Sequence, residues 1–176
     1  MKLEPIPIAG AFLVVPEPHR DERGSFARLY CREEFRRLGL NPEVAQVNAG
    51  ISPQAGTLRG LHFQTGEHAE AKLVSCTRGA VWDVVVDLRP GNGYRTWYGV
   101  KLTPEFETML YIPEGCAHGY LTLMDHTEIR YQTSVPYAPG AAAGVRFDDP
   151  SLGIAWPGEI RLVSAQDRAW PLLGAK

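Results

Sequence analysis

Short apolar segments with a two-residue period run through most of the chain. Residues 81–88 place Trp82, Val84, Val86 and Leu88 on one face and stop at the turn-forming residues 89–93. Six other segments of this kind are bounded by Gly, Pro or charged residues: 12–15, 72–76, 96–102, 109–112, 120–123 and 127–133. This pattern predicts an all-β sandwich or barrel.

Helical patterns are few and short. Residues 32–38 carry Phe35 and Leu38 on one side, and Gly39 is placed to cap the C-terminal end. A closing helical turn is expected at 164–167, with Ser164 as its N-cap. No linker or repeat interrupts the chain, so we expect one domain over residues 1–176.

Composition and charge narrow the class of protein. Of 176 residues, 44% are hydrophobic and 22% are charged, which is typical of a globular domain. The net charge of -2 gives no basic surface for a nucleic acid or an anionic membrane. Three widely spaced cysteines, no signal-peptide pattern and no apolar run of about 20 residues favour a cytoplasmic protein. We therefore expect a small-molecule partner.

Two histidines lie in distinctive contexts. Alternation in residues 57–64 puts Leu61 and Phe63 on one face and His62 with Gln64 on the other, polar face. His118 ends a P-x-G-x-x-H pattern at residues 113–118. That spacing resembles the second motif of the cupin superfamily, which implies a jelly-roll fold, also called a double-stranded β-helix.

The chain departs from the metal-binding cupins at the first motif. Those proteins supply two further histidines and a carboxylate there, because a divalent transition metal needs three or more converging ligands. This chain has Gln64 in place of the second histidine and the cationic Lys72 downstream. We therefore predict no metal site, and a metal-dependent cupin is the weaker alternative.

Acid and base catalysis without a metal is possible with the residues present. Tyr131 shares its inward side with Ile129 and Thr133, and a phenol can donate or accept a proton. Histidine is the usual general base near neutral pH, provided that a carboxylate orients its ring. His62 is the candidate base, and Asp167 is its candidate partner.

Five ordered segments, 21–26, 59–64, 83–89, 112–119 and 164–167, resemble the dTDP-4-dehydrorhamnose 3,5-epimerase family. The similarity extends from about Phe12 to Leu172. It implies an isomerase with a cupin fold whose substrate is a nucleoside-diphosphate 4-keto-6-deoxyhexose. The C4 ketone acidifies the protons on C3 and C5, so no cofactor is implied. A homodimer in which an N-terminal strand crosses to the partner is also implied.

The resemblance also implies residue roles. His62 is the base, Asp167 its dyad partner, and Lys72 the cation that stabilises the enolate oxygen at O4. Tyr131 returns a proton from the opposite face. Six further positions are implied to bind the substrate: the diphosphate ligands Arg23 and Arg59, the sugar-pocket residues Gln46, Asn48 and His118, and Tyr137 near the nucleotide.

Some positions depart from the family pattern. Arg28 replaces a carboxylate, His19 replaces an aromatic residue that stacks on the base, and Gln166 replaces a lysine. The nucleobase therefore stays open. The sugar stays open as well, because residues 49–52 lack the polar residues usual in the family. Alternatives are a C3-only or C5-only epimerase of another nucleotide-linked ketosugar, and a non-catalytic module that binds sugar nucleotides.

Overall fold

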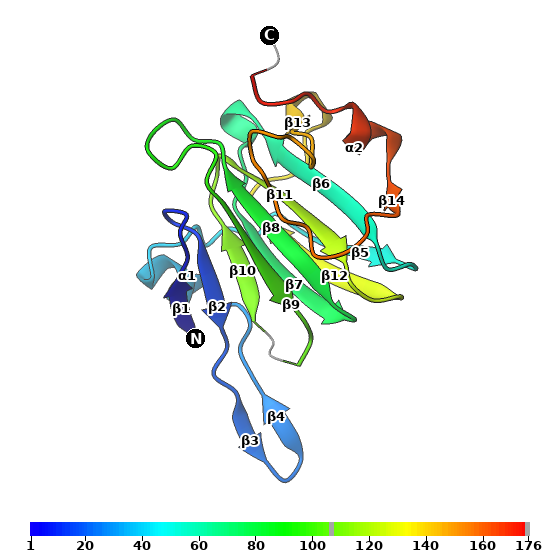
Figure 1. Cartoon of the computed structure of the whole chain (residues 1–176). Helices are drawn as coiled ribbons and strands as arrows, with labels where there is room; N and C mark the ends of the chain where they lie inside the picture. The colour runs from blue at the N-terminus through cyan, green and yellow to red at the C-terminus, as the bar shows by residue number, and fades with distance from the viewer. Residues whose placement is uncertain (106–107, 175–176) are drawn as a thin grey trace.

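Two antiparallel sheets face each other in the computed structural model, which describes residues 1–105 and 108–174 (Figure 1). The first has the strand order β1 (Lys2–Pro5), β2 (Phe12–Val15), β10 (Met109–Ile112), β7 (Lys72–Arg78), β12 (Thr127–Thr133) and β5 (Gln46–Ser52). The second has the order β13 (Ala142–Gly144), β6 (Thr57–Gln64), β11 (Cys116–Thr122), β8 (Val81–Asp87) and β9 (Trp97–Leu102). A short strand, β14 (Leu162–Val163), pairs parallel to β6. The all-β jelly roll expected from the sequence is confirmed.

The main core lies between the two sheets. Val74 and Ile129 of the first sheet pack in one cluster with Val85 and Tyr120 of the second. Such a cluster buries the inward side chains of both sheets, which is the main source of stability in a sandwich. At the end of the sandwich where β5, β6, β7, β11 and β12 meet, the inward residues become polar, and this is where the cavity lies.

Strand β8 is buried on both faces, which explains its nearly continuous apolar sequence. Val85 belongs to the core between the sheets, while Val84 and Val86 pack in a second cluster with Trp156 on the outer face. The predicted face of Trp82, Val84, Val86 and Leu88 does form one cluster. The C-terminal segment covers that outer face, so β8 resembles a central strand rather than a half-exposed one.

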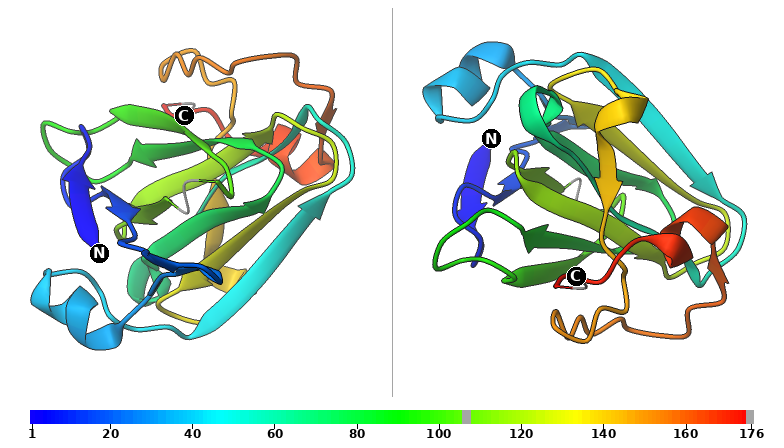
Figure 2. Two further views of the ribbon diagram at one scale, coloured as in Figure 1. Left: turned by 90° about the horizontal axis from the view of Figure 1, so that it is seen from below. Right: turned by 90° about the horizontal axis from the view of Figure 1, so that it is seen from above.

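The helices are short, as expected. Helix α1 (Arg32–Arg37) buries Phe35 against Tyr111, and the chain leaves it through Gly39 at a φ of +76°, where glycine is favoured. Helix α2 (Ala165–Ala169) begins after Ser164, whose hydroxyl accepts a hydrogen bond from the Asp167 amide, so the predicted N-cap is confirmed. The remaining helical turns are η1 (Gly66–His68) and η2 (Pro139–Ala141). Helix α2 lies beside β6, near the edge of the second sheet (Figure 2).

One hairpin projects from the body of the molecule (Figure 1). It consists of β3 (His19–Asp21) and β4 (Gly24–Phe26), and all of its residues are exposed, with 74% of Phe26 accessible. Arg23 lies in its turn and pairs with Asp21. Such an isolated hairpin buries too little apolar surface to be stabilised by its own chain alone.

The observed strands extend some of the predicted ones. Segments 12–15, 109–112 and 127–133 are strands with the predicted bounds. Strand β11 begins at Cys116 rather than at 120, because Cys116 and Ala117 pair with Asp87 and Val86 of β8. His118 therefore lies within β11, and its backbone is paired with His62 of β6 on one side and Val85 of β8 on the other.

Candidate active site

A cavity of about 590 Å³ opens between the two sheets. Strands β5, β7 and β12 form one wall, and β6 and β11 form the other. The lining includes eight of the ten site residues predicted from the sequence: Gln46, Asn48, Arg59, His62, Lys72, His118, Tyr131 and Tyr137. Asp167 lies directly behind His62, and Arg23 lies in the projecting hairpin outside the cavity of its own chain.

His62 and Asp167 form a close pair at the cavity wall. Nε2 of His62 lies 2.6 Å from Oδ1 of Asp167, and the Gly60 amide donates to Oδ2 at 3.3 Å. The imidazole is 44% exposed, whereas the carboxylate is only 5% exposed. The ring is therefore accessible to a ligand while its far side is anchored on a buried anion.

Asp167 remains ionised despite its burial. Burial disfavours the carboxylate, but the hydrogen bond and charge of His62, together with hydrogen bonds from the Gly60 amide and the Ser164 side chain, outweigh this effect and lower the pKa of Asp167. A fixed negative charge next to an imidazole stabilises the imidazolium that forms when the ring accepts a proton. The pair is thus suited to general-base catalysis.

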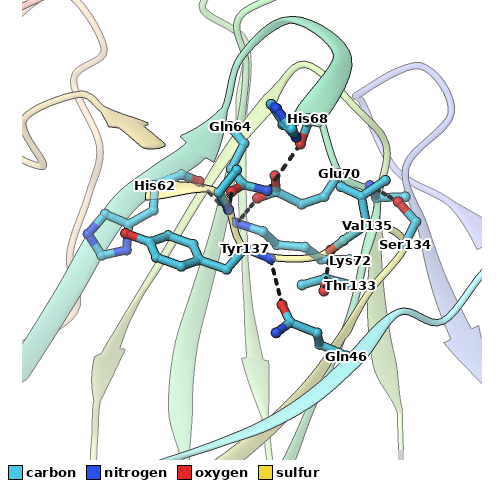
Figure 3. A network of polar contacts seen from close by, with 12 residues as sticks. Gln46, His62, Gln64, His68, Glu70, Lys72, Thr133, Ser134, Val135 and Tyr137 are labelled. Carbon is cyan, nitrogen blue, oxygen red and sulfur yellow. Dashed lines mark hydrogen bonds and ion pairs between the residues drawn. The ribbon is translucent and has the colours of Figure 1, made fainter. Parts of the chain in front are cut away.

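Lys72, on β7 of the facing wall, brings a cation toward His62 through contacts that Figure 3 shows. Its Nζ lies 2.9 Å from Oε1 of Glu70 and donates to the main-chain oxygen of His62 at 3.2 Å. Both side chains of the Glu70–Lys72 pair are less than a tenth exposed. The ammonium is therefore held beside the backbone of the candidate base.

Tyr131 and Arg59 line the cavity from opposite sheets. Tyr131 lies on β12 with Ile129 and Thr133, which also line the cavity, as the alternation predicts. Burial raises the pKa of Tyr131, although the positive charge of Arg59 opposes the shift. The phenol is therefore protonated at neutral pH and can act as a proton donor.

A second histidine–carboxylate pair lies deeper. Nε2 of His118 lies 2.9 Å from Oδ1 of the fully buried Asp83, and His118 is directly opposite His62 in the pairing of β11 with β6. The neighbouring Tyr120 also lines the cavity, and burial raises its pKa to about 12. This part of the wall can present hydrogen-bonding groups to a sugar.

The loop that carries Tyr137 is fixed by two glutamine side chains (Figure 3). Oε1 of Gln46 accepts the Tyr137 amide at 2.7 Å, and Oε1 of Gln64 accepts the Ala138 amide at 2.6 Å. Nε2 of Gln64 donates to the main-chain oxygens of His68 and Pro136. Gln64 stands at the position where metal-binding cupins have a histidine ligand. In this structure its amide group instead forms the hydrogen bonds that fix the loop.

The cavity-lining residues that were not identified from the sequence include Glu70, Tyr120 and Trp170. The ring of Trp170 lies 6.4 Å from that of His62, centroid to centroid, and packs over Gly144. Its sequence context does not separate it from the other three tryptophans. Glu70 lies in a polar segment that resembles a surface turn, and its position two residues before Lys72 is the one available signal.

Within residues 1–105 and 108–174, no three His, Cys, Asp or Glu side chains are grouped so that they could hold a metal ion. In the same ranges, no helix has the length and apolar character needed to cross a membrane.

Comparison with known proteins places the chain in a family. The family model for dTDP-4-dehydrorhamnose 3,5-epimerase matches residues 5–175. The enzyme of that name from Sinorhizobium fredii is 39% identical over 175 residues, which cover 98% of this chain and 90% of the relative.

Solved structures agree with this relationship. The dTDP-4-dehydrorhamnose 3,5-epimerase from Elizabethkingia anophelis has a TM-score of 0.95 and 38% identity, with 100% of this chain and 98% of that chain covered. The Bacillus anthracis enzyme, solved with TDP and pyrophosphate bound, has a TM-score of 0.93 and 35% identity, with coverages of 97% and 98%. The resemblance noted in the sequence is confirmed: the chain belongs to the dTDP-4-dehydrorhamnose 3,5-epimerase family.

Proposed function

We propose that this protein epimerises a dTDP-linked 4-keto-6-deoxyhexose at C3 and C5. The observation that carries the proposal is the His62–Asp167 pair at 2.6 Å, which borders a cavity that also contains Lys72 and Tyr131. Family membership supports the same reaction and the same class of substrate. The chemistry needs no cofactor, because the substrate ketone itself acidifies the protons on its two neighbouring carbons.

Deprotonation is assigned to His62. Its exposed ring accepts the proton from the carbon next to the ketone, and Asp167 stabilises the imidazolium that results. The electron pair of the broken C–H bond moves to form an enolate, with its negative charge on O4. A cation at this oxygen lowers the barrier, and Lys72 supplies one.

Reprotonation is assigned to Tyr131. The phenol projects from the sheet opposite the one that carries His62, so it can deliver a proton to the other face of the planar enolate. Its raised pKa keeps it protonated until the enolate requires a proton. Addition of the proton on that face inverts the configuration of the carbon.

Binding of the nucleotide is assigned to basic and polar groups around the cavity mouth. Arg59 can form paired hydrogen bonds with diphosphate oxygens, and Tyr137 can pack against the nucleoside. Gln46, Asn48 and His118 line the sugar end. The bound TDP of the Bacillus anthracis relative supports a deoxythymidine nucleotide as the ligand.

Arg23 requires a second subunit for its proposed role. It lies outside the cavity of its own chain, on the exposed β3–β4 hairpin. We propose a homodimer in which this hairpin crosses to the other subunit, so that the partner subunit's Arg23 reaches the diphosphate. The accessible ring of Phe26 would then be covered.

Proton NMR in deuterated water tests the reaction directly. With dTDP-4-keto-6-deoxyglucose and catalytic amounts of protein, we expect deuterium at both C3 and C5, and no incorporation with His62→Ala. Label at one carbon alone would identify a single-site epimerase. Absence of exchange with the wild-type protein, folded by circular dichroism, would reject the proposed reaction.

A further inference from the structure

Glu70 is a buried carboxylate to which the mechanism so far gives no part. Its side chain is 5% exposed, one oxygen pairs with Lys72 at 2.9 Å, and the other has no hydrogen-bond partner among the described residues. Among the described residues that line the cavity, Glu70 is the only carboxylate. A buried carboxylate of this kind costs free energy unless a paired cation, here Lys72, compensates its charge.

The geometry around Lys72 limits where its ammonium can point. An ammonium has three N–H groups. One is directed to Glu70 and one to the main-chain oxygen of His62, as Figure 3 shows, which leaves the third for a ligand in the cavity. The two protein contacts therefore fix the cation next to the base and aim its remaining donor.

We propose that Glu70 is a positioning residue that keeps Lys72 charged and directs its free N–H to the substrate oxygen that becomes the enolate. This inference rests on the proposed function, because it assumes that an enolate forms at this site. Glu70 itself does not touch the reacting atoms. It acts through the charge and the orientation of Lys72.

Charge balance gives the proposal its physical basis. Lys72 is buried, and a buried cation is costly unless an anion lies beside it. The positive charge of Arg59 in the same cavity acts in the same direction, whereas the carboxylate of Glu70 opposes both effects. The other titratable groups that line this cavity are His62, His118, Tyr120, Tyr131 and Tyr137. Among the described residues that line the cavity only Glu70 is a carboxylate, and Asp167 behind His62 is already paired with that imidazole, so Glu70 is the anion in direct contact with Lys72.

Glu70→Gln tests this idea because glutamine keeps the size and a hydrogen-bonding oxygen but loses the charge. We expect the exchange rate of Glu70→Gln to stay within about threefold of wild type near pH 6 and to fall at alkaline pH. The alkaline limb of the pH profile should move down by about 1 to 3 pH units. Glu67→Gln, at an exposed position three residues earlier, is the matched control and should keep the wild-type profile. A loss that is equal at every pH, or no change at all, would overturn the proposal.

A labelling experiment separates this proposal from the proposed reaction, because it needs no substrate. Trace acetylation with acetic anhydride, read by mass spectrometry across pH, reports when each amine becomes neutral, with the exposed Lys2 and Lys101 as internal references. In Glu70→Gln, Lys72 should become reactive at lower pH than in the wild type, while Lys2 and Lys101 do not change. An unchanged Lys72 profile would overturn the role of Glu70 even if the enzyme is active. Glu70→Asp should keep the wild-type profile, and it provides the test if Glu70→Gln does not fold.

Discussion

His62 and Asp167 lie 105 positions apart in the chain, yet their side chains are 2.6 Å apart. Strand β14 explains this proximity, because Leu162 and Val163 pair in parallel with Thr57 and Leu58 of β6. The chain then turns into α2 at Ser164 and presents Asp167 to the same strand five residues further along. The C-terminal segment thus completes the candidate site in addition to covering the second sheet.

Replacement of Asp167 by Asn should remove the anion that stabilises the imidazolium and leave the shape of the site intact. We expect the rate of deuterium exchange to fall by about 10² to 10⁴-fold. Asp148→Asn, at an exposed carboxylate paired with Arg146, is the control and should keep wild-type exchange. If Asp167→Asn exchanges as fast as the wild type, Asp167 does not assist His62.

Tyr131→Phe should separate proton removal from inversion. The variant retains His62, so the substrate should still lose its proton and incorporate deuterium from the solvent. Formation of the inverted product should slow by about 10² to 10³-fold, because the opposite face loses its donor. NMR follows both events in one sample, and Tyr94→Phe, at a residue outside the cavity, serves as the control. Product formation at the wild-type rate would exclude Tyr131 as the acid.

Gly144→Ala should disturb the site through Trp170. Gly144 is directly opposite His62 in the pairing of β13 with β6, and an added Cβ would lie 2.4 Å from the Trp170 ring. The indole must move, and its displacement should lower the exchange rate by about tenfold or more, since small misplacements at a reacting centre are costly.

Gly140→Ala is the matched control for this change, because a Cβ at Gly140 meets nothing within 4 Å. It should leave the exchange rate and the melting temperature close to those of the wild type. Intrinsic tryptophan fluorescence should report the altered environment of Trp170 in Gly144→Ala. Wild-type fluorescence and activity in that variant would show that the indole tolerates the added methyl group.

Asp87 should contribute stability that depends on pH. Its side chain is 6% exposed, and the carboxylate accepts hydrogen bonds from Arg89 Nε at 2.8 Å and Nη2 at 2.7 Å. Burial alone would raise the pKa of Asp87, but the hydrogen bonds from Arg89 outweigh it and lower the pKa below 3.8. Because the pKa is lower in the folded state, the contribution is present above about pH 4 and is lost as the pH falls through the folded-state value.

Urea denaturation of wild type and Asp87→Asn provides the measurement. At pH 7 we expect the variant to lose about 1 to 3 kcal/mol of unfolding free energy, because Arg89 loses a charged partner. The difference between the two proteins should shrink as the pH is lowered toward 3. A difference that is constant between pH 7 and 3 would contradict the assigned role of the ion pair.

Much of the fold follows from local patterns. Residues 109–112 and 127–133 alternate or are continuously apolar between polar boundaries, and both are strands with those bounds. Strands β1 and β13 were not predicted because they are short edge strands. Strand β5 has seven residues, but it turns Gln46, Asn48 and Gly50 toward the cavity, so its inward face lacks the apolar period. The start of β11 was placed too late for a related reason, since its first residues are defined by pairing with β8.

The available chemistry could be predicted from residue identity and local pattern: a histidine and a tyrosine on strands, a candidate carboxylate in the tail, and motifs that identify the family. Which of these groups meet depends on the folded arrangement of the chain. It placed Glu70 against Lys72 and Trp170 beside His62, and it left Arg23 outside the cavity of its own chain. Periodicity specifies which side of a strand a residue occupies, but contacts between distant segments depend on sheet order and register. Those are set by burial of the whole core rather than by any local sequence.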